Sequence, residues 1–364
     1  MSKDGKLRIA MVAPPWFEIP PEGYGGIEDM VATLIEGLSQ RGHDVTLVAA
    51  GEDRTDARFA PTFRSPPEGL GGPDTMAIEL IHAQRTNERL VEIEHDVVHD
   101  HSAVGPLFAP HRESPTVMTV HGPVSGWMKQ VYRELRSVHL VAISDAQRAS
   151  SPDLPWVGTV YNGIDVESFP LIEEKEDHVV FLGRMNPEKG VAEAVEVARR
   201  IGRKLLIAAK CNEEAEEKYF DEYVRPRLGK DAVFLGDVDG AEKRELLGRA
   251  SALIFPIQWE EPFGLVMIEA MACGTPVLAL GRGSVPEVVD EGVTGFVCDD
   301  LDGMVEAYPR MAELSPIRIR ERAFERFDGS RMTDGYEAAY RTAVQTGHLP
   351  RAVDHEAETV NASD

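Results

Sequence analysis

Two glutamates and a short run of backbone amides lie around the start of one predicted helix. In WEEPFGLVMIEAMACGTPV, Glu269 follows Glu261 by eight residues, about two turns into the predicted helix. Pro262 suits the first helical position, so the next N–H groups would have no intrahelical partner and could bind an anion. These N–H groups belong to Phe263, Gly264 and Leu265. Because the two carboxylates would bracket such an anion, the segment predicts a site for a sugar attached to a diphosphate.

The elements around this segment are those of a nucleotide-binding α/β domain. Gly274 and Pro276 end the predicted helix, and the apolar run at 277–280 predicts a strand. Further strands are predicted at 178–184, 204–210, 232–238 and 252–258, with helical patterns between them. Strands that alternate with helices form a parallel, doubly wound sheet, so we expect the second half of the chain to be one such domain.

The first half predicts a second domain of the same class. A strand at 7–15 leads through a Gly/Pro-rich loop into a helix that ends near Ser39, and a strand at 44–51 follows. The segment from about 54 to 73 is predicted to be a loop, before a helix near 75–94. Three short strands come next, in DVVHDHS, TVMTVHGP and LVAIS. Each ends in polar residues, and parallel sheets bind their ligands at that end.

The turn-rich segment at 156–170, which contains Asn162 and Gly163, is predicted to connect the two domains. We therefore place an N-terminal domain at 1–163 and a C-terminal domain at 164–327. The segment FERFDGSRMTDGYEAAYRTAV predicts closing helices. Residues 349–364 lack apolar periodicity and are expected to be disordered.

Length and composition fit this arrangement. The chain has 364 residues, enough for two ordinary domains with a cleft between them. Its 43% hydrophobic and 27% charged residues are typical of soluble globular proteins, and no apolar run is long enough to span a bilayer or to serve as a signal peptide. The sequence therefore predicts a cytoplasmic protein, in which Cys211, Cys273 and Cys298 are reduced thiols.

The net charge of −24 argues against nucleic acid as a partner. It also means that a phosphate site must be locally positive. Arg184 and Lys189, in GRMNPEKG after a predicted strand, could supply that charge in the cleft. The planar fork of arginine and the compact charge of lysine both suit phosphate.

The Glu-x7-Glu spacing within EPFGLVMIEAMACGTPV, followed by GSVPEVV and GVTGF, resembles the retaining family 4 glycosyltransferases. The resemblance covers roughly residues 6–345 and implies the GT-B fold, in which two Rossmann-like domains face a cleft. It also implies that a helix at about 328–346 crosses back to the N-terminal domain. In this family an Arg and a Lys at matching places hold the donor diphosphate, which is the role expected for Arg184 and Lys189.

The resemblance implies site residues in the N-terminal domain as well. Gly25 and Gly26, in EGYGGIEDM, match the glycine loop that faces the donor phosphates, and Tyr24 is expected on the acceptor side. His121 matches a residue beside the transferred sugar. Ser144 is a weaker match on the acceptor side.

For the C-terminal domain, the resemblance gives each glutamate a role. Glu261 is expected to bind hydroxyls of the transferred sugar, and Glu269 the paired hydroxyls of the nucleotide ribose. Lys210 and Val238 are expected to line the pocket of the base. Preorganised donors would stabilise the departing diphosphate. These donors are Arg184, Lys189 and the backbone around Phe263, Gly264 and Leu265.

The expected activity is a retaining transfer of a hexosyl group from a UDP- or GDP-sugar to a hydroxyl acceptor, which could be a sugar, a small metabolite or a lipid-linked molecule. In this family the donor phosphate takes the acceptor proton, and we expect no metal or other cofactor to be required. UDP-glucose, UDP-N-acetylglucosamine and GDP-mannose all remain open as donors. A sugar-nucleotide 2-epimerase and a non-catalytic partner subunit of the same fold are competing functions.

Two other patterns could serve different chemistry. His99 and His101, with Asp96 and Asp100, could bind a metal ion, although DVVHDHS resembles a strand of these transferases at which no metal is held. The DVD at 237–239 fits a turn better than a metal-binding Asp-x-Asp.

In SGWMKQVYRELRS, apolar residues recur at helical spacing beside basic ones. They are Trp127, Met128, Val131 and Leu135. Such a helix either packs in the core or contacts a membrane surface, so peripheral membrane contact is a further alternative.

Overall fold

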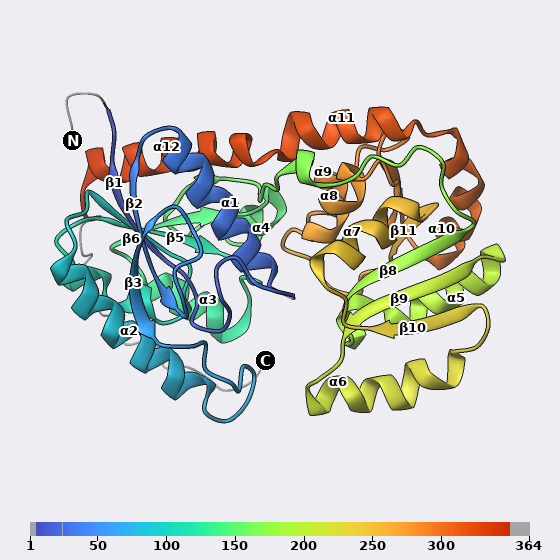
Figure 1. The fold of residues 1–364 in the computed structure, drawn as a ribbon, viewed down its shortest axis with the longest axis horizontal. Coiled ribbons are helices and arrows are strands. Elements are labelled where there is room, and N and C mark those ends of the chain that lie inside the picture. Colours follow the sequence, from blue (N-terminus) through green and yellow to red (C-terminus); the bar gives the residue numbers. More distant parts are fainter. Residues whose placement is uncertain (1–4, 24, 350–364) are drawn as a thin grey trace.

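The computed structural model describes residues 5–23 and 25–349. Tyr24 and residues 350–364, which are all of the predicted disordered tail except Leu349, lie outside the described residues. The structure consists of two parallel α/β halves, one on the left and one on the right of Figure 1. The predicted α/β class with two doubly wound sheets is therefore confirmed.

The first half contains a parallel sheet of seven strands in the part of the chain that the structure describes, in the order β3-β2-β1-β4-β5-β6-β7. Its strands are β1 (Arg8–Val12), β2 (Asp44–Ala50), β3 (Arg58–Phe63), β4 (Val97–Asp100), β5 (Thr116–Val120), β6 (Val138–Ala142) and β7 (Trp156–Thr159). Its helices are α1 (Gly26–Gln40), α2 (Thr75–Glu92), α3 (Gly126–Glu134) and α4 (Asp145–Ala149), with a 3₁₀ segment at Gly105–His111.

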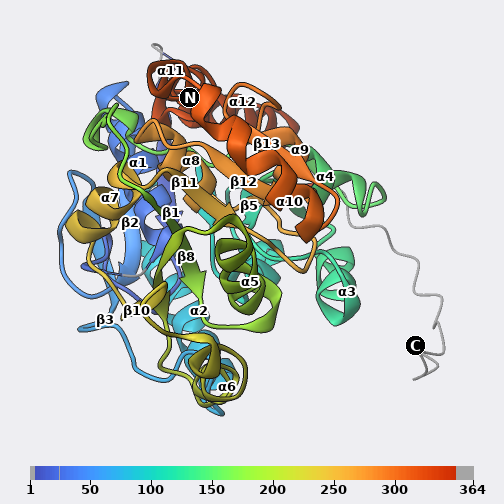
Figure 2. The same cartoon turned by 90° about the vertical axis from the view of Figure 1, so that its right-hand side faces the viewer.

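The second half contains a parallel sheet of six strands among the described residues, in the order β10-β9-β8-β11-β12-β13. Its strands are β8 (His178–Arg184), β9 (Lys204–Lys210), β10 (Ala232–Gly236), β11 (Ala252–Phe255), β12 (Val277–Leu280) and β13 (Gly295–Cys298). Its helices are α5 (Val191–Ile201), α6 (Glu214–Tyr219), α7 (Gly240–Arg249), α8 (Leu265–Ala272), α9 (Val285–Val288), α10 (Leu301–Ala307) and α11 (Pro316–Phe327). Helices α5 and α10 cover one face of this sheet, and α7, α8 and α11 the other (Figure 2).

Three strands were not predicted from the sequence. The segment predicted as a loop at 54–73 contains β3, an edge strand with Pro61 inside it. Proline cannot donate to a strand ladder, so its presence weakens the strand pattern and confines it to an edge. The predicted connection at 156–170 begins with the other edge strand, β7, which is only partly buried. The short strand β13 lies in the GVTGF segment, at an edge of the second sheet.

The last helix, α12 (Gly329–Thr346), lies over the first half of the chain, as Figure 1 shows at its top left. It packs against α1, β4, β5 and β7. Tyr336 and Tyr340 of α12 are fully buried in the same hydrophobic core as β1 and β2. The chain thus passes between the halves twice, once before Ile164 and once at Asp328, and these two residues form a β-bridge.

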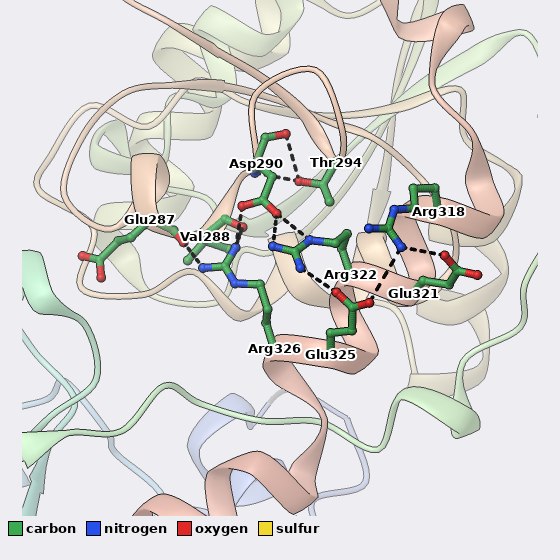
Figure 3. Close-up of polar contacts among 9 residues, drawn as sticks. All are labelled: Glu287, Val288, Asp290, Thr294, Arg318, Glu321, Arg322, Glu325 and Arg326. Carbon is green, nitrogen blue, oxygen red and sulfur yellow. Dashed lines mark hydrogen bonds and ion pairs between the residues drawn. The ribbon is translucent and has the colours of Figure 1, made fainter.

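A cluster of arginines fixes α11 to the loop that follows α9 (Figure 3). Arg322 and Arg326 both donate to the Asp290 carboxylate, at 2.8 and 2.7 Å. The Glu287 side chain points away from this cluster, as Figure 3 shows, and accepts from the backbone N–H groups of Asp145 and Ala146 of the first half. The arginine cluster therefore holds a segment that touches both halves of the molecule.

The predicted amphipathic helix around Trp127 is α3. Its apolar residues divide between two environments, because Tyr132 and Leu135 are buried whereas Trp127 is 74% exposed. Packing in the core therefore explains only part of this pattern, and membrane contact stays a prediction. Within residues 5–23 and 25–349, no helix has the length and apolar character needed to cross a bilayer.

Candidate functional site

Among the pockets between the halves, two adjoin each other at the carboxyl ends of both sheets. The first, here called the helix-start pocket, has a volume of about 210 Å³. It brings together Gly25, Gly26, Arg184, Lys189, Lys210, Val238, Gly264, Leu265 and Glu269. The second, here called the histidine pocket, has a volume of about 410 Å³ and is lined by His121, Glu261 and Phe263, among others. Arg184, Lys189 and Gly264 line both pockets, so the two form one continuous site.

The helix at the centre of this site is α8, and it begins three residues later than predicted. Its first residue is Leu265, and Gly264 precedes it with φ +77°, a left-handed conformation that favours glycine. Pro262 is therefore not at the first helical position, and Glu269 lies little more than one turn into the helix rather than two. The later start keeps the free N–H groups of α8 at the pocket.

The starts of α1 and α8 face each other across the site. A Cβ atom added to Gly26 would lie 2.9 Å from the Leu265 side chain. The absence of a side chain at position 26 therefore permits this close approach. Two helix N-termini directed at one space favour the binding of an anion there.

Lys189 and Glu261 form the central ion pair of the site. The Lys189 Nζ atom lies 2.5 Å from Glu261 Oε2, which also accepts a bond of 2.8 Å from Trp259 Nε1. Lys189 Nζ lies 5.0 Å from the centroid of the Trp259 ring. Both protein donors bond to the same carboxylate oxygen, which leaves Oε1 to accept from a ligand hydroxyl.

The loop that carries Lys189 is held by a hydrogen bond within the loop and by one from Gln258. Asn186 accepts a bond from the Lys189 backbone N–H at 3.0 Å, and Gly190 follows with φ +75°. The carbonyl of Glu188 also accepts from the Gln258 backbone. These contacts fix the direction from which the lysine enters the pocket.

Arg184 lines both pockets, but carboxylates already surround it. Its guanidinium lies 2.8 Å from Glu216 and 2.8 Å from Glu213, and Lys210 Nζ is 3.2 Å from the same Glu213. Glu216 is buried and belongs to the capping box of α6. The sequence analysis missed these two acids, and they reduce the positive charge that Arg184 presents to a ligand.

Glu269 has a partner that the sequence analysis did not name. Lys243 of α7 donates to Glu269 Oε1 at 2.7 Å, which leaves Oε2 to accept from a ligand in the pocket that Glu269 lines. The DVD turn lies at the start of the same helix, where Asp239 accepts from the N–H groups of Ala241 and Glu242. The interpretation of Asp237–Asp239 as a turn is therefore confirmed, with Asp239 as a helix cap.

Hydrogen bonds connect the predicted histidine to the core of the first half. His121 and His101 lie 2.9 Å apart through Nε2 and Nδ1. His99 bonds to Thr119 at 2.8 Å and to Tyr340 of α12 at 2.6 Å. Burial lowers the pKa of His121 to about 4, and it lowers the pKa of His99 and His101 well below the usual range. All three imidazoles are therefore neutral at pH 7.

The alternative metal cluster does not converge on one point. The Asp96 carboxylate bonds to Arg8, and Asp100 to Arg112 at 2.9 Å, so neither acid joins His99 and His101. Throughout the described part of the chain, no group of three or more His, Cys, Asp or Glu side chains is placed to hold a metal ion. These contacts explain the two aspartates as partners of arginines.

Ser144 does not line either pocket. It is fully buried and caps α4, where its hydroxyl accepts a bond of 3.0 Å from the Gln147 backbone. These contacts indicate a structural role for Ser144, as the cap of α4. The other residue predicted for the acceptor side, Tyr24, lies outside the described residues.

Glu28 is the most unusual carboxylate of the site, and the sequence analysis did not single it out. It lies in the first turn of α1, is only 4% exposed and lines the histidine pocket. Burial raises its pKa to about 7. The only sequence signal for a role of Glu28 in the site is its position just after the glycine loop at Gly25 and Gly26.

We expect Glu28→Gln to stabilise the protein at pH 8. A carboxyl whose pKa is higher in the folded than in the unfolded state favours folding below pH 4.5, and loses that contribution as the pH rises through about 7. At about 1.4 kcal/mol per pKa unit, the shift corresponds to roughly 3–4 kcal/mol. Thermal unfolding should therefore show a higher Tm for the variant at pH 8 and no gain at pH 4.5, with Glu88→Gln on the surface of α2 as the control. A variant that is equally destabilised at both pH values would contradict the expectation.

A larger hollow, of about 690 Å³, lies elsewhere, between α2 and the 3₁₀ segment that follows β4. Its arginines are already paired: Arg8 with Glu94 and Asp96, and Arg112 with Asp100. The cations of the pockets between the halves are also paired, but they lie beside two helix starts that follow glycines, which makes these pockets the candidate site.

Comparison with known proteins identifies the two halves separately. Residues 24–168 match the family model described as Glycosyltransferase Family 4. Residues 165–310 match the model described as Glycosyl transferases group 1.

Curated relatives span nearly the whole chain. A glycogen synthase of Mycobacterium tuberculosis is 28% identical over 407 aligned positions, which cover 95% of this chain and 97% of the relative. An alpha-maltose-1-phosphate synthase of the same species is 30% identical, with 84% of this chain and 88% of the relative covered. A phosphatidyl-myo-inositol mannosyltransferase of Mycolicibacterium smegmatis is 28% identical, with 94% and 95% covered.

Solved structures share the fold. AviGT4, a glycosyltransferase involved in avilamycin A biosynthesis, is 25% identical with a TM-score of 0.69, and covers 94% of this chain and 100% of its own. Sucrose-phosphate synthase from Thermosynechococcus elongatus has a TM-score of 0.76 at 19% identity over 94% of this chain and 100% of its own. Anabaena Alr3699/HepE in complex with UDP-glucose has a TM-score of 0.68 at 16% identity, with 93% and 100% covered. The predicted GT-B fold is thereby confirmed.

Proposed function

Since the chain belongs to glycosyltransferase family 4, we propose that it is a retaining enzyme that moves a hexosyl group from a nucleoside diphosphate sugar to a hydroxyl acceptor. The observation that carries the proposal is the Lys189–Glu261 ion pair beside the start of α8. It places one cation, one carboxylate oxygen and free backbone N–H groups around a single point of the cleft. A diphosphate attached to a sugar needs those three partners.

The helix-start pocket suits the nucleotide. The diphosphate would lie against the N–H groups at Gly264 and Leu265, with Lys189 and Arg184 beside it. The free oxygen of Glu269 would accept from the ribose hydroxyls, with Lys243 holding the carboxylate in place. Lys210 and Val238 line the same pocket and would lie near the base.

The transferred sugar would lie where the two pockets meet, with Glu261 Oε1 bonded to its hydroxyls. In the proposed step the bond from the sugar carbon to the phosphate oxygen breaks, and a bond to the acceptor oxygen forms on the same face. The acceptor proton passes to the departing phosphate oxygen. Lys189 and the α8 N–H groups would stabilise the negative charge that develops there, so the proposal needs no divalent cation.

The neutral state of His121 defines its part in this step. An imidazole whose pKa is lowered to about 4 does not supply a positive charge at pH 7. It can exchange a hydrogen bond with a sugar hydroxyl, while His101 holds the ring through its other nitrogen. We propose that His121 orients the transferred sugar.

A calorimetric screen of UDP, GDP, ADP and their glucose, N-acetylglucosamine and mannose derivatives tests the proposal. The UDP-sugars come first, because the structure of Anabaena Alr3699/HepE contains UDP-glucose. We expect one base to bind, the binding to survive EDTA, and Glu269→Ala to weaken it at least tenfold. Product analysis with and without an acceptor then separates transfer from 2-epimerisation and from a non-catalytic subunit. Binding of none of these nucleotides would refute the proposal.

A further inference from the structure

The N-terminal wall of the histidine pocket, where an acceptor would approach, carries no lysine or arginine among the residues described. It is built from the segment after β1, the start of α1, Leu70 and the segments that follow β5, β6 and β7. Its polar or aromatic members are Trp16, Phe17, Glu28, His121 and Asn162. A wall of this kind offers hydrogen bonds and aromatic faces but no positively charged side chain.

The charge on this wall is negative or absent. Within the described chain, no Lys, Arg or His lies within ion-pair distance of Glu28, and the charged group that acts on it is another acid, Asp29. His121 stays neutral because burial lowers its pKa to about 4. A phosphate or carboxylate placed against this wall would meet a buried acid, and the wall has no cationic side chain to offset the repulsion.

The cations of the pocket come from the opposite wall and are already engaged. Lys189 is paired with Glu261 at 2.5 Å, and Arg184 is held between Glu213 and Glu216. Both also line the helix-start pocket, where the proposed diphosphate would lie. The donor would therefore use the only two cations that line the histidine pocket in the described part of the chain.

Aromatic rings complete the pocket in fixed orientations. Trp16 Nε1 donates to Glu79 at 2.7 Å, and Trp259 Nε1 donates to Glu261 at 2.8 Å. Each bond anchors the polar edge of an indole that lines the pocket. The C–H face of a sugar ring packs against such aromatic surfaces, while its hydroxyls exchange hydrogen bonds with carboxylate, amide and imidazole groups.

We infer that the acceptor is an uncharged polyhydroxylated molecule, such as a free sugar or the end of a glycan, and that Glu28 disfavours acceptors that carry phosphate. Glu28 is thus a specificity-determining residue that contacts the acceptor. This inference rests on the proposed function, because it assumes that the sugar donor occupies the helix-start pocket. It distinguishes this chain's acceptor from a sugar phosphate or a phospholipid headgroup.

The test compares acceptors in matched pairs, with the donor saturating at pH 8. Each pair contains a neutral compound and its phosphorylated form: glucose with glucose 6-phosphate, maltose with maltose 1-phosphate, and myo-inositol with its 1-phosphate. Release of nucleoside diphosphate and product mass are measured. We expect kcat/KM for the neutral member of the best pair to exceed that of its phosphorylated twin at least tenfold. Equal or better use of the phosphorylated twin would overturn the inference.

Glu28→Gln separates charge from shape, because glutamine keeps the size and hydrogen-bonding capacity of the side chain. At pH 8 we expect the variant to lower the ratio of kcat/KM for the neutral acceptor to kcat/KM for its phosphorylated form at least fivefold. Most of this change should come from a higher kcat/KM for the phosphorylated form. Glu28→Ala should lower kcat/KM for the neutral acceptor at least fivefold, since it removes the hydrogen bond as well. Glu88→Gln, on the surface of α2, is the matched control and should leave both values unchanged. If the ratio in Glu28→Gln equalled that of the wild type, the Glu28 charge would not be what disfavours phosphorylated acceptors.

Failure of this inference is distinguishable from failure of the proposed function. A protein that binds and slowly hydrolyses a nucleoside diphosphate sugar, yet transfers to no neutral acceptor, would overturn the acceptor assignment and leave the donor site standing. A protein that neither binds nor hydrolyses any such donor would refute the proposed function itself.

Discussion

Glu261→Ala is expected to lower kcat for transfer between about a hundredfold and a thousandfold, with a smaller change in donor KM. The physical reason lies in the two oxygens of this carboxylate. Oε2 holds Lys189 at 2.5 Å, and Oε1 is the one that would bind the transferred sugar. The substitution thus removes a sugar contact and frees the cation that faces the departing diphosphate. Glu261→Gln should fall between alanine and the wild type, because it keeps the side-chain volume and a hydrogen-bonding group.

Glu269→Ala is the matched comparison, and we expect it mainly to raise the donor KM, by about tenfold or more. Glu269 lies farther along α8 and bonds to Lys243 rather than to Lys189, so its proposed contact is with the ribose, which does not react. Initial rates at varied donor concentration measure both variants, with Glu217→Ala on the exposed side of α6 as the control. Equal losses of kcat in the two variants would contradict this division of roles.

Much of the site could be predicted because its residues lie at places that the chain order fixes. The end of α8 at Ala272, before Gly274 and Pro276, follows from local rules for helix termination. The carboxyl ends of neighbouring parallel strands meet at one edge of a sheet, which is why Arg184 at the end of β8 and the start of α8 after β11 converge. Topology, rather than side-chain detail, placed these groups correctly.

The motif predicted helix α8 correctly, but it predicted the first residue of the helix three positions too early. Pro262 is acceptable at a first helical position, but Gly264 adopts a left-handed conformation that a helix interior does not permit. A local propensity rule could not detect that conformation, since tertiary contacts hold the preceding segment. One such contact is the bond from the Ser284 hydroxyl to the Phe263 carbonyl.

The partners of the charged residues could not be predicted, because they come from distant parts of the chain. Lys189 and Glu261 are 72 residues apart, and Arg184 and Glu216 are 32 apart. In a chain with a net charge of −24, almost every cation has several acids nearby in sequence, so spacing alone does not select one. The burial of Glu28 could not be predicted either, because the apolar periodicity of α1 does not indicate a buried acid in its first turn.

The number of carboxylate partners also indicates which of the two cations of the donor site attracts a phosphate more strongly. Arg184 lies between two carboxylates, whereas Lys189 has one, Glu261, which itself belongs to the proposed sugar site. A ligand phosphate would therefore gain less from Arg184 than the sequence analysis implied. The net attraction for a departing diphosphate should come mainly from Lys189 and from the α8 N–H groups.

Lys189→Ala is accordingly expected to lower kcat by about a hundredfold to a thousandfold, which is the effect usual for the loss of one preorganised donor to a developing charge. Its ammonium is held by Glu261 and lies over the Trp259 ring, and Gly190 with φ +75° allows the loop to turn directly after it. Little rearrangement is then needed when negative charge appears on the leaving oxygen. Arg184 cannot compensate, because Glu213 and Glu216 hold its guanidinium.

The measurement combines transfer rates with equilibrium binding of the nucleoside diphosphate product. Because the charge grows mainly in the transition state, kcat should fall much more than product affinity, which we expect to change by less than about tenfold. Lys189→Arg should recover only part of the rate, since a planar fork does not fit the position of a compact ammonium between Glu261 and Trp259. Lys218→Ala, on the exposed face of α6, is the control for the loss of one lysine from an acidic chain. If Lys189→Ala kept a rate within threefold of the wild type, the stabilisation of the departing diphosphate would have to come from the α8 N–H groups and Arg184 instead.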